Sequence, residues 1–149
     1  MKNLIVFTAL NTIYSAVIAV EINLICDVKS TYTYSSGTVE KGFGNALIEV
    51  SDKRSFKSIF ITSDDEVANN LSVLSRQDGS TQSIDNSTSA KWDIENSAKR
   101  VDGSSRTRIV IDRTTGILIA NRDFETNGRV NRSNVSGVCR KNDASTKKF

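Results

Sequence analysis

The sequence contains no histidine among its 149 residues. Imidazole is the side chain that titrates near neutral pH, and it is also the commonest nitrogen ligand of protein-bound metals. Its absence excludes the common Ser-His hydrolase triads and every histidine-bearing metal site. Because the carboxylates do not follow the spacing of a calcium loop either, we expect no metal and no cofactor.

Cysteine is nearly absent as well, since only Cys26 and Cys139 occur. Two thiols alone are too few for a structural zinc site, and no histidine is available to activate a catalytic thiol. In an oxidising compartment an isolated pair usually forms a disulfide. We therefore predict a Cys26–Cys139 bond that makes the first and last strands neighbours; the alternative is two free buried thiols.

The chain has no proline, no internal repeat and only one long apolar run, residues 4–20, which follows Lys2. A short positive start and an interrupted apolar segment are typical of a secretory signal peptide. We predict that residues 1–19 are removed after Ala19, leaving a periplasmic or secreted protein without a stable membrane span. The alternative is an uncleaved N-terminal anchor.

The sequence also lacks a large excess of charge of either sign, because its net charge is only +3. Loss of Lys2 with the signal peptide leaves +2, and a basic C-terminal tail, residues 140–149, carries +3 of charge by itself. The body, residues 20–139, is therefore slightly acidic. This balance does not favour nucleic-acid binding, and we expect one monomeric domain.

The sequence is rich in short segments in which apolar and polar residues alternate, the pattern of half-buried strands. Strands are predicted over residues 21–34, 46–50, 56–62, 91–97, 106–112, 117–122 and 129–140. Their number and spacing predict a mainly β protein, either an antiparallel barrel or a two-layer sandwich of about seven or eight strands. The last three strands should form a meander.

Two turn signals define that meander. In the segment from Asp112 to Gly116, the aspartate accepts local backbone hydrogen bonds and the glycine supplies a positive φ. Asn127-Gly128 is the preferred pair for a type I′ hairpin turn. Both hairpins are therefore predicted to be antiparallel and short.

Two intervening segments are less regular. Residues 63–78 match a helix capping box at Ser63 to Glu66, yet residues 70–76 alternate equally well as a strand, and we favour the strand. Residues 79–90 are rich in Ser and Thr, and we expect an exposed connection with Ile84 as its only anchor.

The sequence Ile111-Asp112-Arg113-Thr114-Thr115-Gly116, followed by Gly137-Val138-Cys139, resembles a loose group of small secreted bacterial proteins. Members of that group carry a signal peptide, an early cysteine and a C-terminal hairpin of the form I-D-R-x-T-G. The resemblance covers mainly the last forty residues. It implies export and a fold context, and no catalytic residues.

Candidate binding residues are basic. Arg106 and Arg108 share one face of a predicted strand, and Arg122 lies on the partner strand, so the three could form a basic strip. The alternative is a solvated face that balances nearby carboxylates. Tyr32 and Tyr34 could line a ligand cavity, although alternate aromatics on a strand more often belong to a core.

These features together predict an exported, non-enzymatic binding domain whose target is a protein or an anionic envelope component, bound through the basic strip or a barrel mouth. One alternative is a structural envelope protein without a discrete ligand. A second is a carboxylate-dependent hydrolase, which would need one carboxyl with a raised pKa. The candidate carboxylates are Asp64-Asp65-Glu66 and the pair Asp93 and Glu95.

Overall fold

A computed structural model of the chain describes residues 20–53, 56–69, 71–74 and 81–142. Residues 1–19, the predicted signal peptide, and 143–149, most of the predicted basic tail, lie outside the described residues. No helix within the described ranges is long and apolar enough to cross a membrane.

The described chain forms one antiparallel sheet of nine strands with a single turn of helix. The strands are β1 Val20–Thr33, β2 Val39–Lys53, β3 Phe56–Ser63, β4 Ser72–Leu74, β5 Thr81–Asp85, β6 Lys91–Arg100, β7 Gly103–Asp112, β8 Ile117–Thr126 and β9 Arg129–Lys141. The helix is α1, Glu66–Asn69. This confirms the predicted mainly β class, and the terminal meander is β7, β8 and β9.

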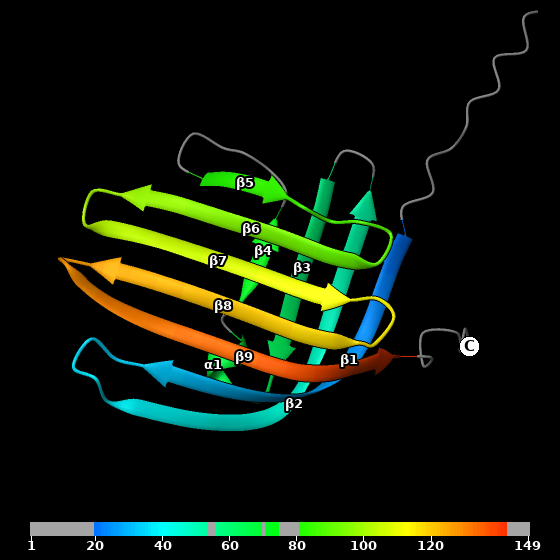
Figure 1. Cartoon of the computed structure of the whole chain (residues 1–149), viewed down its shortest axis with the longest axis horizontal. Helices are drawn as coiled ribbons and strands as arrows, with labels where there is room; N and C mark the ends of the chain where they lie inside the picture. The colour runs from blue at the N-terminus through cyan, green and yellow to red at the C-terminus, as the bar shows by residue number, and fades with distance from the viewer. Residues whose placement is uncertain (1–19, 54–55, 70, 75–80, 143–149) are drawn as a thin grey trace, which may run out of the picture.

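The strand order, β4-β3-β2-β1-β9-β8-β7-β6-β5, joins two meanders through the pairing of β1 with β9. In Figure 1, β5 to β9 form the front layer, while β3 and the adjoining parts of β1 and β2 cross behind them. The sheet is therefore curled into a half-barrel, and β4 contacts β6 and β7 across its interior. The choice between barrel and sandwich that the sequence left open is resolved as one open, curled sheet.

The interior is built from the alternation that the sequence displays. On β1 the residues Leu24, Cys26 and Val28 are buried, whereas their neighbours face outward. One continuous apolar cluster joins the two layers, and its largest fully buried side chains include Ile48, Ile59, Leu71, Ile94, Ile109, Ile111 and Leu118. Burial of such side chains is the main favourable contribution to folding.

One local prediction is wrong, and another is completed by the structure. The segment 79–90 contains a strand, β5, and Ile84 is an exposed residue on its outer face and not an anchor. Residues 63–78 contain both a helical turn, α1, and a short strand, β4, so each of the two competing interpretations is correct for part of the segment. The extra strand β5 brings the total to nine.

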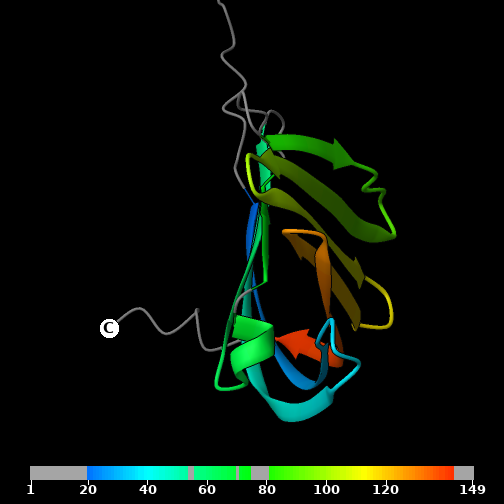
Figure 2. The same ribbon diagram turned by 90° about the vertical axis from the view of Figure 1, so that its left-hand side faces the viewer.

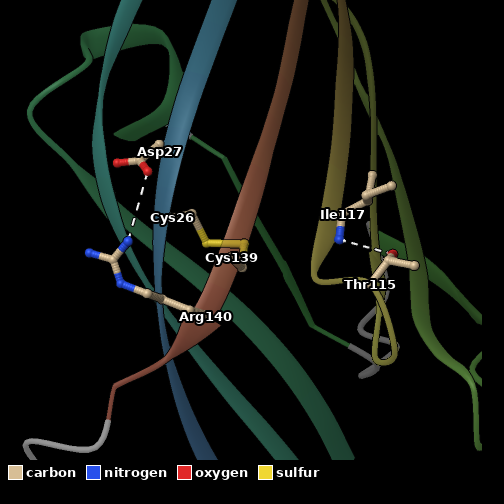
Figure 3. The surroundings of a disulfide bond; sticks show 6 residues. All are labelled: Cys26, Asp27, Thr115, Ile117, Cys139 and Arg140. Carbon is tan, nitrogen blue, oxygen red and sulfur yellow. Dashed lines mark hydrogen bonds and ion pairs between the residues drawn. A yellow bond between two sulfur atoms is a disulfide. The ribbon is translucent and has the colours of Figure 1, made fainter.

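The disulfide prediction is confirmed, because Cys26 and Cys139 are bonded and lie directly opposite each other on β1 and β9 (Figure 3). The N–H of Cys139 points away from β1, to the carbonyl of Gly116. Cys26 and Cys139 are thus a non-hydrogen-bonded pair, the type in which opposite Cα atoms approach most closely. Their Cα atoms are 4.0 Å apart.

Both predicted hairpin turns are present. Asp112 accepts hydrogen bonds from the backbone N–H groups of Thr114 and Thr115, at 2.9 and 2.7 Å, and Gly116 has a φ of +74°. Hydrogen bonds from these N–H groups lower the pKa of the Asp112 carboxyl. Asn127 and Gly128 both have positive φ, as a type I′ turn requires.

Candidate binding site

A cavity of about 370 Å³, the mouth pocket, opens at one end of the half-barrel. It is lined by Tyr32, Tyr34, Glu40, Glu66, Val67, Arg122, Phe124, Asn131 and Ser133. Apart from Tyr34, which directly follows β1, these residues come from β1, β2, α1, β8 and β9, whose segments at this end face the viewer in Figure 2. Its size falls in the range of small-molecule binding sites.

Four of the lining residues, Tyr32, Glu40, Arg122 and Ser133, belong to a longer row of polar side chains that runs across the sheet, one residue per strand. Strand pairing aligns Ser83, Asn96, Thr107, Arg122, Ser133, Tyr32 and Glu40 from β5 to β2. We call this the polar row. All its members share the inner face, because they alternate with outward-facing residues from the same strands.

The next row toward the middle of the sheet is of a different kind. It aligns Ile94, Ile109, Ala120 and Val135, all of them buried. On β6 to β9 the interior thus changes from apolar to polar within one two-residue step along the strands, whereas the same row is already polar at Asp85 on β5 and Ser30 on β1.

Aromatic rings flank the polar row. Tyr32 and Tyr34 pack edge to face with their ring centroids 4.6 Å apart. On the other side, the Arg122 guanidinium lies 5.8 Å from the centre of the Phe124 ring, within the range of a cation–π contact. Rigid aromatic rings from β1 and β8 therefore enclose the polar groups between them.

Hydrogen bonds fix two more groups at the rim. The Tyr34 hydroxyl donates to Glu40 at 3.0 Å, and this bond raises the pKa of Tyr34 above its ordinary value of 10.0. The Asn131 carbonyl oxygen accepts from the Ser35 backbone N–H at 2.9 Å. The tip of the β1–β2 hairpin is thereby tied to β9.

The helical turn α1 is held at the mouth by Asp65, its N-terminal capping residue. One carboxylate oxygen of Asp65 accepts the N–H of Ala68 at 2.8 Å, and the other accepts the Ser30 hydroxyl at 2.9 Å. A methyl group at Gly42 would collide with this carboxylate. Gly42 therefore lets α1 approach the sheet, and it lies within β2, which begins before the strand predicted over residues 46–50.

The predicted basic residues Arg106 and Arg108 lie on the outer face, where each is paired with a carboxylate. Arg106 donates to Glu95 at 2.7 and 2.9 Å, and Arg108 donates to Asp93 at 2.9 and 2.8 Å. Because the acids match the arginines one for one, these two residues do not form a basic strip.

Asp93 is the most constrained carboxylate of this cluster. Its side chain is only 1% exposed, and it also accepts a bond from Lys91 at 2.7 Å. The Arg108 hydrogen bonds, opposed by burial and reinforced by Lys91, lower the pKa of Asp93 from 3.8 to about 2. A general acid needs the reverse, a raised pKa, so this carboxylate is not suited to that role.

Arg122 is separated from the other two arginines by the thickness of the sheet. It pairs with Thr107, which is buried, so its side chain shares the inner face, whereas Arg106 and Arg108 face outward. The alternation of Leu118, Ala120 and Arg122 was the available signal. Only the register of the hairpin shows that this face is the interior.

Sequence reasoning did not identify most of the mouth pocket. Phe124, Asn131 and Ser133 follow the inward phase of β8 and β9, but their place beside Tyr32 depends on the pairing of β1 with β9. Tyr32 and Tyr34, in contrast, are placed as the ligand-cavity interpretation proposed. Within the described ranges, no group of three or more acidic or sulfur ligands is arranged to hold a metal ion.

A larger hollow, about 660 Å³, lies beside the hairpin ends of β6 to β9. Its lining is mostly Ser, Gln and charged side chains, with Arg106 and Lys99 facing Asp123 and Glu125. Both hollows carry charges of both signs, but three aromatic rings line the mouth pocket and none lines this hollow, so the mouth pocket is the better candidate site.

Comparison of the chain with protein-family models, with curated proteins and with solved structures found no match.

Proposed function

We propose that this protein is an exported, non-enzymatic binding domain that takes its ligand in the mouth pocket. The observation that carries the proposal is the pocket itself, in which aromatic rings of β1 and β8 enclose a row of polar side chains. Pockets with this mixture of apolar walls and a few convergent polar groups are typical of ligand sites.

The ligand of this pocket is an envelope component or a group on a partner protein. The mouth pocket contains Glu40, Glu66 and Arg122, so its formal charge is not positive and does not favour a polyanion. The outer arginines Arg106 and Arg108 add little, since Glu95 and Asp93 neutralise them. The disulfide fits export, because such bonds persist in oxidising compartments.

The proposal is tested with two double variants that each remove positive charge. Arg122→Ala/Phe124→Ala changes the mouth pocket, and Arg106→Ala/Arg108→Ala changes the outer face. Each purified protein is immobilised, exposed to cell-envelope extract and washed, and the retained material is identified by mass spectrometry. Circular dichroism and thermal unfolding check that each variant is folded.

The wild type and the outer-face variant should retain the same material, and the mouth variant should lose it. Retention by all three proteins, loss in the outer-face variant alone, or no retained material with the wild type would each contradict the proposal.

A further inference from the structure

The apolar core ends at the polar row, although packing alone does not require polar side chains there. The position of this row, one row from Ile109 and Ala120, would suit further apolar residues, which would extend the core to the mouth. Instead, Thr107 and Ser133 are buried polar residues of this row. Buried polar groups are unfavourable unless they find hydrogen-bond partners, and they are common where a site must recognise polar ligands.

Two atoms of the row lack such a partner among the described residues. They are the hydroxyl oxygen of Ser83 and the carbonyl oxygen of Asn96, which face each other across β5 and β6. Buried polar atoms without partners are uncommon in folded proteins and call for an explanation. The row therefore stays polar from the mouth toward the β5 edge, beyond the side chains that line the pocket.

The chemical inventory of the mouth pocket is the second observation. Tyr32, Tyr34 and Ser133 offer hydroxyls that both donate and accept, and Asn131 offers an amide that does the same. Glu40 and Glu66 offer acceptors, and Arg122 offers donors. A ligand that matches this set must itself carry many groups that donate and accept at once. Hydroxyl groups have this property, whereas phosphates and carboxylates only accept.

The aromatic rings supply the third observation. Phe124 pairs with Asn131, and the residue after Tyr34 donates to that same asparagine. The backbones of Phe124 and Tyr34 thus lie on either side of Asn131, about two strand spacings or ~10 Å apart. Flat rings in these positions offer apolar faces to a ligand whose own faces carry C–H groups and whose edges carry hydroxyls.

From these three observations we propose that the mouth pocket binds a carbohydrate, with one or two sugar rings lying between Phe124 and Tyr34 and their hydroxyls meeting the polar row. The inference rests on the proposed function and names its ligand class. A peptide strand is a poorer match, because the pocket lies on the face of the sheet, away from the edge strands β4 and β5 that would pair with it. A fatty acyl chain is poorer too, because it would place apolar methylene groups against the polar side chains that line the pocket.

The test uses a panel of immobilised mono- to tetrasaccharides containing neutral hexoses, N-acetylhexosamines or uronic acids. Polyphosphate and an acidic peptide serve as anionic comparison probes. The saccharide that the purified protein retains best is then titrated in solution by NMR. We expect amide shifts clustered at Tyr32, Phe124 and Ser133, and an affinity that changes less than about twofold between ~0.05 and ~0.5 M salt.

Phe124→Ala should weaken binding of that saccharide at least about tenfold, since one stacking face is removed. Phe43→Ala is the matched control, because Phe43 is an outer-face ring that is 85% exposed, and it should leave the affinity unchanged within about twofold. Tyr34→Phe keeps the ring and the fold while removing one hydroxyl, and it should weaken binding several-fold.

Retention of no saccharide, retention of the anionic probes alone, or equal saccharide affinity in Phe124→Ala and the wild type would overturn the carbohydrate assignment. If the envelope-extract experiment still shows mouth-dependent retention, the binding function stands and only its ligand class is wrong. If both experiments fail, the mouth pocket is not a binding site.

Discussion

Arg108 and Arg122 carry the same guanidinium group on adjacent strands, yet they lie on opposite faces of the sheet. Arg108 meets a buried carboxylate on the outer face, whereas Arg122 lies over the Phe124 ring at the mouth pocket. At the scale of the residue, therefore, the face decides the role. The side-chain type alone indicates only that a charge must be solvated or paired.

The pairing of Asp93 predicts a specific dependence of stability on acid. The pKa of Asp93 in the folded protein, about 2, is below its ordinary value of 3.8, so its ion pairs stabilise the fold at neutral pH. Linkage makes this about 2 kcal/mol, present above pH ~4 and lost as the pH falls toward 2. Asp93→Asn should therefore be less stable than the wild type at pH 7, and the gap should narrow at low pH.

Urea unfolding at a series of pH values measures that gap. Asp123→Asn is the control, because Asp123 belongs to an exposed pair with Arg132 and should contribute less than about 1 kcal/mol. A gap between Asp93→Asn and the wild type that stays constant from pH 7 to pH 2 would contradict the linkage argument.

Two inward-facing serines give a second prediction at this scale. The Ser30 hydroxyl donates to the buried Asp65, and Ser30→Ala should destabilise the protein by about 1 to 3 kcal/mol because the carboxylate loses a donor. The Ser83 hydroxyl is buried with no partner in the described part of the chain, so Ser83→Ala should be neutral or stabilise by up to about 1 kcal/mol. Chemical denaturation compares the two, and a larger loss for Ser83→Ala would show this account to be wrong.

At the scale of the element, turn residues and the alternation of apolar and polar residues predicted the two C-terminal hairpins correctly. The β7–β8 and β8–β9 hairpins follow from Asp112, Gly116 and Asn127-Gly128, whose backbone requirements are local. The β2 strand was predicted too short, since Gly42 and Gly44 are unfavourable in strands. They are retained because Asp64 and Asp65 approach the backbone there, a requirement that comes from a distant segment.

Gly42→Ala tests that explanation. The added methyl would meet the Asp65 carboxylate and the Ser30 hydroxyl, and the resulting shift of α1 or β2 should cost about 1 to 3 kcal/mol in the free energy of unfolding. The double variant Gly42→Ala/Asp65→Ala should lose less than the sum of the single losses, because the colliding group is gone. Thermal or urea unfolding of the four proteins measures the coupling, and additive losses would refute the explanation.

At the scale of the whole molecule, the fold consists of two meanders, β1 to β4 and β5 to β9. Among the described strands, β1 and β9 are the only hydrogen-bonded pair that joins one meander to the other. The disulfide crosses this same pair. A second link is ionic: Lys57 on β3 reaches Asp85 on β5 at 2.9 Å. Burial works to raise the pKa of Asp85, but hydrogen bonds from Ser87 and Lys57 outweigh it and lower that pKa.

Removal of the disulfide should therefore weaken the joint between the meanders. Cys26 and Cys139 are separated by 113 positions, and the loop-entropy argument for so long a loop gives roughly 4 to 5 kcal/mol. We expect Cys26→Ala/Cys139→Ala to lose about 2 to 5 kcal/mol in urea unfolding. Equal stability of this variant and the oxidised wild type would contradict the expected role, and the reduced wild type is the matched control.

The sequence by itself determined the β class and the two C-terminal hairpins, because period-2 alternation and positive-φ turn residues are local signals. It also determined the disulfide, because each of two cysteines has only one possible partner. Tertiary structure decided the rest. Which face of β8 is interior, and so whether Arg122 joins Arg106 or Tyr32, depends on hairpin register and on the β1–β9 pairing. The mouth pocket exists only after the sheet curls, since its walls come from segments up to a hundred residues apart, such as Tyr32 and Ser133.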